Sequence, residues 1–93
     1  MEPEYTNAKA IAPELTQENL SSMTLVDLKV LWDRLFAAMK ADGCTGFHAT
    51  PDMEALEKLP SDEERERHWL IGVMGMLGAS FRGEYEDITE TVR

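Results

Sequence analysis

The chain has 93 residues, which fits a single domain. It contains 18 acidic and nine basic residues, giving a formal net charge of −9, and 43% of its residues are hydrophobic. The hydrophobic content argues against a wholly disordered chain. The acidic balance argues against direct binding to nucleic-acid phosphates or to an anionic membrane surface. It suits solubility, or a basic protein partner.

Three further features bear on the compartment and on membrane insertion. Cys44 is the only cysteine, so no intrachain disulfide can form, and a single thiol suits a reducing environment. The N-terminal stretch MEPEYTNAKA lacks the apolar segment of a signal peptide. The longest apolar run is well short of the roughly 20 residues that a membrane span requires. We therefore expect a soluble, cytoplasmic protein without a membrane partner.

The N-terminal residues 1–14 are predicted to form a tail, because Pro3 and Pro13 interrupt regular structure and the side chains between them are small or polar. Thr16 is then placed to cap a short helical turn over about 16–23. At the other end, residues 84–93 are acidic and are predicted to form a tail or a frayed turn. Residues 15–83 between them are predicted to form one helical domain.

The first long helix is predicted over about residues 24–42, between a good N-cap, Thr24, and a good stop, Gly43. Its apolar residues recur at spacings of three and four, which places them on one face: Leu25, Leu28, Leu31, Trp32, Leu35, Phe36 and Met39. Residues 44–51 follow as a loop. A short helix is then predicted over about residues 52–59, and Pro60 ends it.

The second long helix is predicted over about residues 61–82. Ser61 is its N-cap, Glu64 completes a capping box, and Gly83 is its stop. Arg67 lies four residues after Glu63, a spacing that favours an ion pair. Together these elements predict an all-α fold: a small bundle of three to four helices, with two long amphipathic helices, one short helix and acidic, partly disordered termini.

The stretch WLIGVMGMLGASF, residues 69–81, is the most apolar part of the chain, yet every third position is a glycine. Steps of about 100° per residue place the large apolar side chains on one face: Leu70, Val73, Met74, Leu77 and Phe81. Gly72, Gly75 and Ala79 lie on the opposite side, with Trp69 and Met76 along one edge. Each helix-interior glycine costs about 1 kcal/mol relative to alanine, so close packing must offset this cost.

Two kinds of occupant explain a face of small residues. An intrachain element, either residues 15–23 or the short helix 52–59, explains it fully. A second copy of the chain or another protein explains it as well, because Gly75 and Ala79 have the small-xxx-small spacing of close helix contacts. The partner-binding residues are then Trp69, Gly72, Gly75, Met76 and Ala79. A buried strand is disfavoured, since it has no partner strand and a capping box leads into the stretch.

Signals for catalysis or metal binding are weak. Cys44 and His48 have a C-x3-H spacing, but structural zinc usually needs four Cys or His ligands. Glu64 and His68 stand four residues apart, like an acid–base pair but also like many ordinary helix surfaces. No glycine-rich phosphate loop follows a strand. We therefore predict a protein that is not an enzyme and has no catalytic, metal or cofactor site.

These patterns favour a small acidic interaction module that regulates or inhibits a protein partner. One alternative is an acidic inhibitor of a nucleic-acid-processing machine, which copies the charge of a nucleic-acid backbone and occupies a basic groove. Its acidic surface is Glu84, Glu86, Asp87 and Glu90, joined by Glu2, Glu4 and Glu14 if the termini meet. In size and acidity alone, the chain is similar to phage-encoded anti-defence proteins such as anti-CRISPRs. A second alternative is a homodimeric structural protein that self-associates through the glycine-lined face.

Overall fold

The computed structural model describes residues 4–47 and 53–84. These residues form an all-α domain, as predicted. In chain order its elements are α1 (Thr6–Ile11), the 3-10 turn η1 (Ala12–Glu14), α2 (Gln17–Ser21), α3 (Leu25–Ala41), α4 (Met53–Glu57) and α5 (Asp62–Phe81). None of the helices in this part of the chain has the length and apolar character that crossing a bilayer requires.

Three of the helices begin at the caps that the sequence predicts. The hydroxyls of Thr16, Thr24 and Ser61 each accept a hydrogen bond, at 3.2 Å, from the backbone N–H three residues later. α3 and α5 are followed by Gly43 and Gly83, whose φ angles are +87° and +78°. Glycine adopts this left-handed region without strain and is the usual residue at such helix ends. Local sequence therefore determines where the long helices start and stop.

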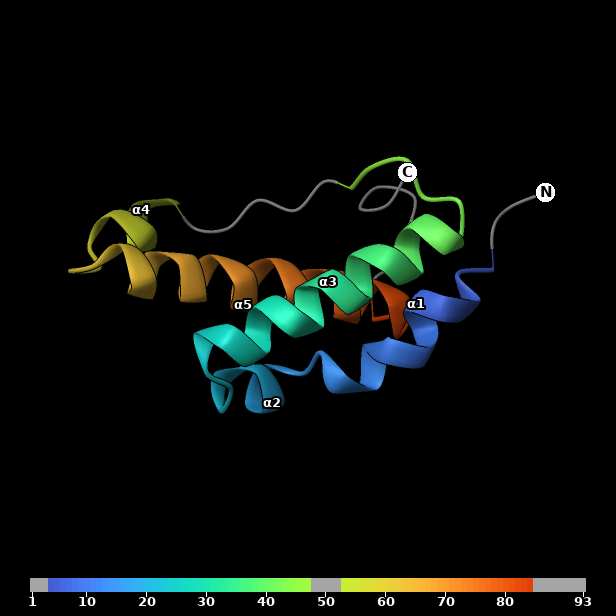
Figure 1. Cartoon of the computed structure of the whole chain (residues 1–93), viewed down its shortest axis with the longest axis horizontal. Coiled ribbons are helices and arrows are strands. Elements are labelled where there is room, and N and C mark those ends of the chain that lie inside the picture. The colour runs from blue at the N-terminus through green and yellow to red at the C-terminus, as the bar shows by residue number, and fades with distance from the viewer. Residues whose placement is uncertain (1–3, 48–52, 85–93) are drawn as a thin grey trace.

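α5 is the central element of the domain. α3 and α5 begin at the same end of the molecule and cross along its length, while the chain from α1 to α2 runs the opposite way beside them (Figure 1). α4 lies beside the first turns of α5. Each of the other elements contacts α5. For this reason α5 buries more of its circumference than a helix that packs on one side only.

The core faces of the two long helices are those that the periodicity predicts. The five large apolar residues of α5 are buried, and they meet a buried row on α3: Leu28, Leu31, Leu35 and Met39. Phe36 was predicted to belong to this row, but 53% of its surface is exposed. At about 100° per residue it lies at the edge of the apolar stripe, away from its buried centre.

The N-terminal segment belongs to the core, so the predicted tail over residues 1–14 is wrong where the structure describes it. Tyr5, Ala8 and Ala12 are buried, and the Tyr5 ring lies 5.7 Å from that of Phe81. Leu15, which follows η1, is fully buried. The alanines leave no wide apolar stripe in the sequence, but their small size lets a short helix pack closely against α3 and α5.

Polar contacts to distant residues fasten this segment. The guanidinium of Arg82 at the end of α5 donates hydrogen bonds to the carbonyl oxygens of Ala12 and Leu15, at 2.7 and 3.2 Å. The Ala12 carbonyl also accepts the backbone N–H of Leu15 at 3.0 Å, so the guanidinium adds a second hydrogen bond to it, and the Leu15 carbonyl lies directly after η1. At the other end of this segment, the carboxylate of Asp42 accepts hydrogen bonds from the backbone N–H groups of Asn7 and Ala8 in the first turn of α1.

Arg67 has a different partner from the predicted one. Its guanidinium donates a hydrogen bond to the carbonyl oxygen of Ser21 at 2.6 Å. It donates two more to the carbonyl oxygen of Met23, the closer at 3.1 Å. No ion pair between Arg67 and Glu63 is present among the described residues. The predicted pair is therefore wrong. The guanidinium instead bonds two backbone carbonyl oxygens at and just after the end of α2. A solvent-exposed ion pair with Glu63 would stabilise the fold only a little.

Candidate functional site

Four of the five predicted partner-binding residues line one open depression on α5. They are Gly72, Gly75, Met76 and Ala79, and the depression has a volume of about 350 Å³. Gly72 is exposed and the other three are half-buried. The remaining described lining residues come from the segment after η1 and from the end of α5: Leu15, Gln17, Arg82 and Glu84. We call this the glycine surface.

The glycines of α5 are not equivalent. A Cβ atom at Gly78 would lie 2.4 Å from the Cβ of Leu15 and 3.0 Å from its carbonyl oxygen, so no side chain fits there. At Gly75 the nearest atoms would be the Oε1 of Gln17 at 3.8 Å and a methyl of Leu20 at 3.9 Å. Those are ordinary van der Waals distances. Packing within the chain thus explains Gly78, but it does not require a glycine at position 75.

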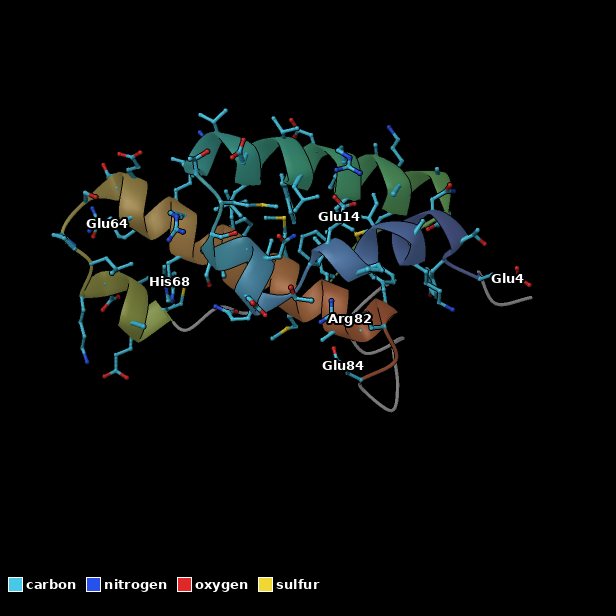
Figure 2. The ribbon with its side chains drawn as sticks, turned by 90° about the horizontal axis from the view of Figure 1, so that it is seen from below. Glu4, Glu14, Glu64, His68, Arg82 and Glu84 are labelled. Carbon is cyan, nitrogen blue, oxygen red and sulfur yellow. The ribbon has the colours of Figure 1, made fainter. Side chains whose placement is uncertain are left out.

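The two intrachain elements that could have covered the small residues lie in different places. The segment of residues 15–23 lies against α5 at Gly75 and Gly78. α4 lies at the other end of α5, beside Glu64 and His68 (Figure 2). The segment 15–23 covers one edge of the predicted face and leaves the depression open.

Trp69 lies apart from the glycine surface. Its indole is half-buried and packs edge-on against that of Trp32 in α3, with ring centroids 5.8 Å apart. Trp32 also contacts the rings of Phe36 and Phe47, at 6.2 and 5.7 Å. The helix position of Trp69 lies near the glycines, but its long side chain extends toward α3. The structure therefore places it in an aromatic cluster rather than in the predicted binding face.

Next to this cluster is a hollow between α3 and residues 44–47. Its volume is about 480 Å³, and its described lining residues are Phe36, Met39, Lys40, Cys44, Thr45, Gly46 and Phe47. We call it the α3 hollow. The sequence pattern did not point to it, since a helix and a loop each contribute one wall. Phe47, a large apolar residue in a polar loop, was the only local signal.

The thiol of Cys44 is suited to lining the α3 hollow rather than to acting as a nucleophile or a metal ligand. Burial, and secondarily the negative charge of Asp42, raises the pKa of Cys44. The protonated form is then favoured, whereas nucleophiles and metal ligands are thiolates. His48, its candidate partner, lies outside the described residues. The described chain holds no group of three or more His, Cys, Asp or Glu that could bind a metal ion.

Glu64 and His68 lie on the exposed first turns of α5 (Figure 2). They line a shallow depression of about 360 Å³ together with Leu59, Arg67 and Ile71. Among the described contacts, no hydrogen bond joins the Glu64 carboxylate to the His68 imidazole. The spacing alone therefore does not produce an acid–base pair.

Glu84 is the one member of the predicted acidic surface that lies among the described residues, together with Glu4 and Glu14 of the N-terminal segment. Figure 2 shows Glu4, Glu14 and Glu84 well separated. Glu84 forms a salt bridge with Arg82 at 2.9 Å, and Glu14 forms one with Arg34 at 3.1 Å. The other predicted members, Glu2, Glu86, Asp87 and Glu90, lie outside the described residues.

Comparison with known proteins adds no relative from which a function could be transferred. No protein-family model matches the chain, and neither a curated protein nor a solved structure shows significant similarity to it. The described residues form a small all-α domain, and two of its open depressions differ in character: one is lined by small residues and one by aromatic residues.

Proposed function

We propose that this protein is a small, acidic, non-enzymatic interaction module that binds a helix of a partner protein on its glycine surface. One observation carries the proposal. Gly75 bears the helix-interior cost of glycine, about 1 kcal/mol relative to alanine, although the nearest atoms leave room for a Cβ. A residue that weakens its own helix without an internal reason is explained by a partner whose backbone approaches there.

The chemistry of the glycine surface suits a helix. Glycine and alanine leave the α5 backbone accessible, so that a second helix axis can come closer than larger side chains allow. Met76 beside them has a flexible, polarisable side chain, which adapts to an apolar partner face. Gln17 and the Arg82–Glu84 pair supply a polar rim around this centre, the usual arrangement in a protein interface.

The charge distribution favours a partner with a basic rim. Most basic side chains of the described residues serve internal contacts: Lys29, Arg34, Arg65 and Arg82 in salt bridges and Arg67 with backbone carbonyls. The acidic excess of a chain with a net charge of −9 is then left facing outward. Such a field accelerates encounter with a positively charged protein more than it tightens the final complex. We propose that the module regulates or inhibits its partner by occupying it.

The first experiment asks whether the partner is a second copy. Molar mass is measured by light scattering over a concentration series, at low and at high salt. A dimer that persists at high salt and is abolished by Gly75→Leu and by Gly72→Gln assigns the surface to self-association. Gly72 is exposed, so the second variant tests the surface without disturbing the core. Val26→Leu, at an exposed position on α3, is the control.

If the chain is monomeric, the same variants are used as bait in quantitative affinity capture at both salt concentrations. A partner on the glycine surface is retained by the wild type and Val26→Leu, lost by both glycine variants, and only weakly sensitive to salt. A partner retained by both glycine variants contradicts the proposal. Binding that disappears with salt and with charge reversal at Glu84, Glu86 and Asp87 favours the alternative, an acidic inhibitor of a nucleic-acid-processing machine.

A further inference from the structure

The α3 hollow is separate from the glycine surface, and it has the character of a ligand site. We propose that it binds a small amphipathic anion, an apolar body that carries a carboxylate. The proposal rests on the form of the hollow, on its apolar walls and on Lys40, the one cation in its described lining, which forms no salt bridge with the described residues.

The hollow has the size and walls of a site for a small molecule. Its volume of about 480 Å³ lies within the range of roughly 300–1,000 Å³ that is usual for such sites. Phe36, Met39, Cys44 and Phe47 provide the apolar lining. Met39 is 4% exposed, whereas Phe36 is 53% exposed. A large aromatic ring left in water at the edge of a hollow gains by being covered, and an apolar ligand covers it.

The aromatic walls are held in place before any ligand binds. Trp32 packs against both rings, with centroid distances of 6.2 Å to Phe36 and 5.7 Å to Phe47. The Phe47 contact is edge-on, at an interplanar angle of 79°, which is a favoured geometry for aromatic pairs. Trp32 in turn packs on Trp69 of α5. A preformed hollow loses less conformational entropy on binding than one that must first order its walls.

The charge of the expected ligand follows from Lys40. It is the one charged side chain in the described lining, since the Cys44 thiol is neutral. Within the described residues Lys40 forms no salt bridge, in contrast to Lys29 on the same helix, which pairs with Glu66 at 3.2 Å. A lysine stem lies along apolar surface while its ammonium stays in water. This combination selects a ligand with an apolar body and a negative end.

The form of the hollow favours a small molecule over a second protein. Walls from two segments, α3 and residues 44–47, make it concave, and a concave apolar site with few polar groups buries most of a small ligand. Octanoate is the simplest probe of this chemistry. Octanol and octylammonium have the same apolar chain with a neutral and a positive end, so they separate the contribution of charge from that of the hollow.

Binding is measured by tryptophan fluorescence, because both tryptophans belong to the aromatic cluster, and by amide chemical shifts. Octanoate is expected to bind several-fold more tightly than octanol and to shift the amide signals of residues 44–47. Octylammonium is expected not to bind. Lys40→Gln should weaken octanoate about twofold to fivefold and leave octanol unchanged, as for one partly exposed ion pair. Phe36→Ser should weaken both ligands. Lys58→Gln, directly after α4, and Val26→Ser on α3 are matched controls.

Three outcomes overturn the proposal: no shift at residues 44–47 with any of the probes, equal affinity for octanoate and octanol, or an octanoate affinity that Lys40→Gln leaves unchanged. Protection of the Cys44 thiol provides an independent readout. Octanoate in the hollow should slow alkylation of Cys44 by iodoacetamide, and octylammonium should not. Both Lys40 and Phe36 are exposed, and thermal unfolding of each variant verifies that the fold is retained.

Discussion

Asp42, at the C-terminal end of α3, caps the first turn of α1. Its Oδ2 accepts a hydrogen bond from the backbone N–H of Ala8 at 2.9 Å, and its Oδ1 accepts one from the N–H of Asn7 at 3.0 Å. Tyr5, the residue before the helix, supplies no side-chain cap. The first N–H groups of a helix lack internal partners and favour a negative charge. α1 therefore depends on an acceptor far away in the sequence.

Replacing this cap should destabilise the domain. Asp42→Ala leaves two N–H groups of α1 without their acceptor, and we expect the free energy of unfolding to fall by about 1–3 kcal/mol. Urea denaturation followed by circular dichroism measures it. Asp33→Ala, at an exposed site on the same helix, should change stability by less than about 0.5 kcal/mol. Equal effects of the two variants would show that the cap contributes nothing.

The two central glycines of α5 should respond oppositely to alanine. Gly78→Ala forces a methyl group against Leu15, and overpacking of this kind lowers stability by about 1–3 kcal/mol. Gly75→Ala meets only ordinary contacts and should raise stability by about 0.5–1 kcal/mol, the helix preference of alanine over glycine. Chemical denaturation of the matched pair measures both. If Gly75→Ala is destabilised, packing within the chain requires a glycine at position 75, and the proposed partner at this surface loses its support.

Arg67 should contribute to stability and Glu63 should not. Arg67→Gln removes the guanidinium that holds the carbonyl oxygens of Ser21 and Met23, and the expected loss is about 1–3 kcal/mol. Glu63→Gln is the control, with an expected change below about 0.5 kcal/mol. Thermal unfolding of the single variants and of the double variant separates the two residues. A large interaction energy between the two substitutions would show that Arg67 and Glu63 do form the ion pair that their spacing favours.

The raised pKa of Cys44 should be visible in its reactivity. Since the thiolate is the reactive form, alkylation by iodoacetamide should reach its half-maximal rate at a higher pH in the folded protein than in the urea-unfolded chain. The sign for stability follows by linkage: the neutral thiol is favoured by folding, so stability is retained while both states are protonated and declines once the unfolded thiol ionises. Cys44→Ala should remove this alkaline decline. A folded profile shifted to lower pH would contradict the burial of the thiol.

Much of the architecture depends on residues that are close together in the sequence. Thr24 and Gly43 mark the ends of α3, and Ser61 and Gly83 mark those of α5, since each acts within one or two turns of its own helix. The periodic apolar residues of both helices identified the faces that meet in the core. The weak cap at Thr16 was enough to predict α2. The all-α class and the positions of the long helices could therefore be predicted from the sequence.

The candidate sites could be predicted only in part. Angular position on α5 correctly grouped Gly72, Gly75, Met76 and Ala79, which line one depression. It misplaced Trp69, because the angle of a Cα atom does not show which neighbour a long side chain will reach. The α3 hollow was not predicted at all, since its walls come from a helix and a loop that carry no common pattern.

By itself, the sequence determined the helices, their ends and their apolar faces, because those depend on hydrogen bonds and side chains only a few residues apart. The tertiary structure alone decided that residues 5–14 belong to the core, that Arg67 holds α2, and that Gly78 but not Gly75 is needed for packing. Those outcomes depend on partners such as Asp42 for α1 and Arg82 for Ala12, the latter 70 positions apart. Periodicity and capping act within single helices, so they carry no information about contacts over such separations.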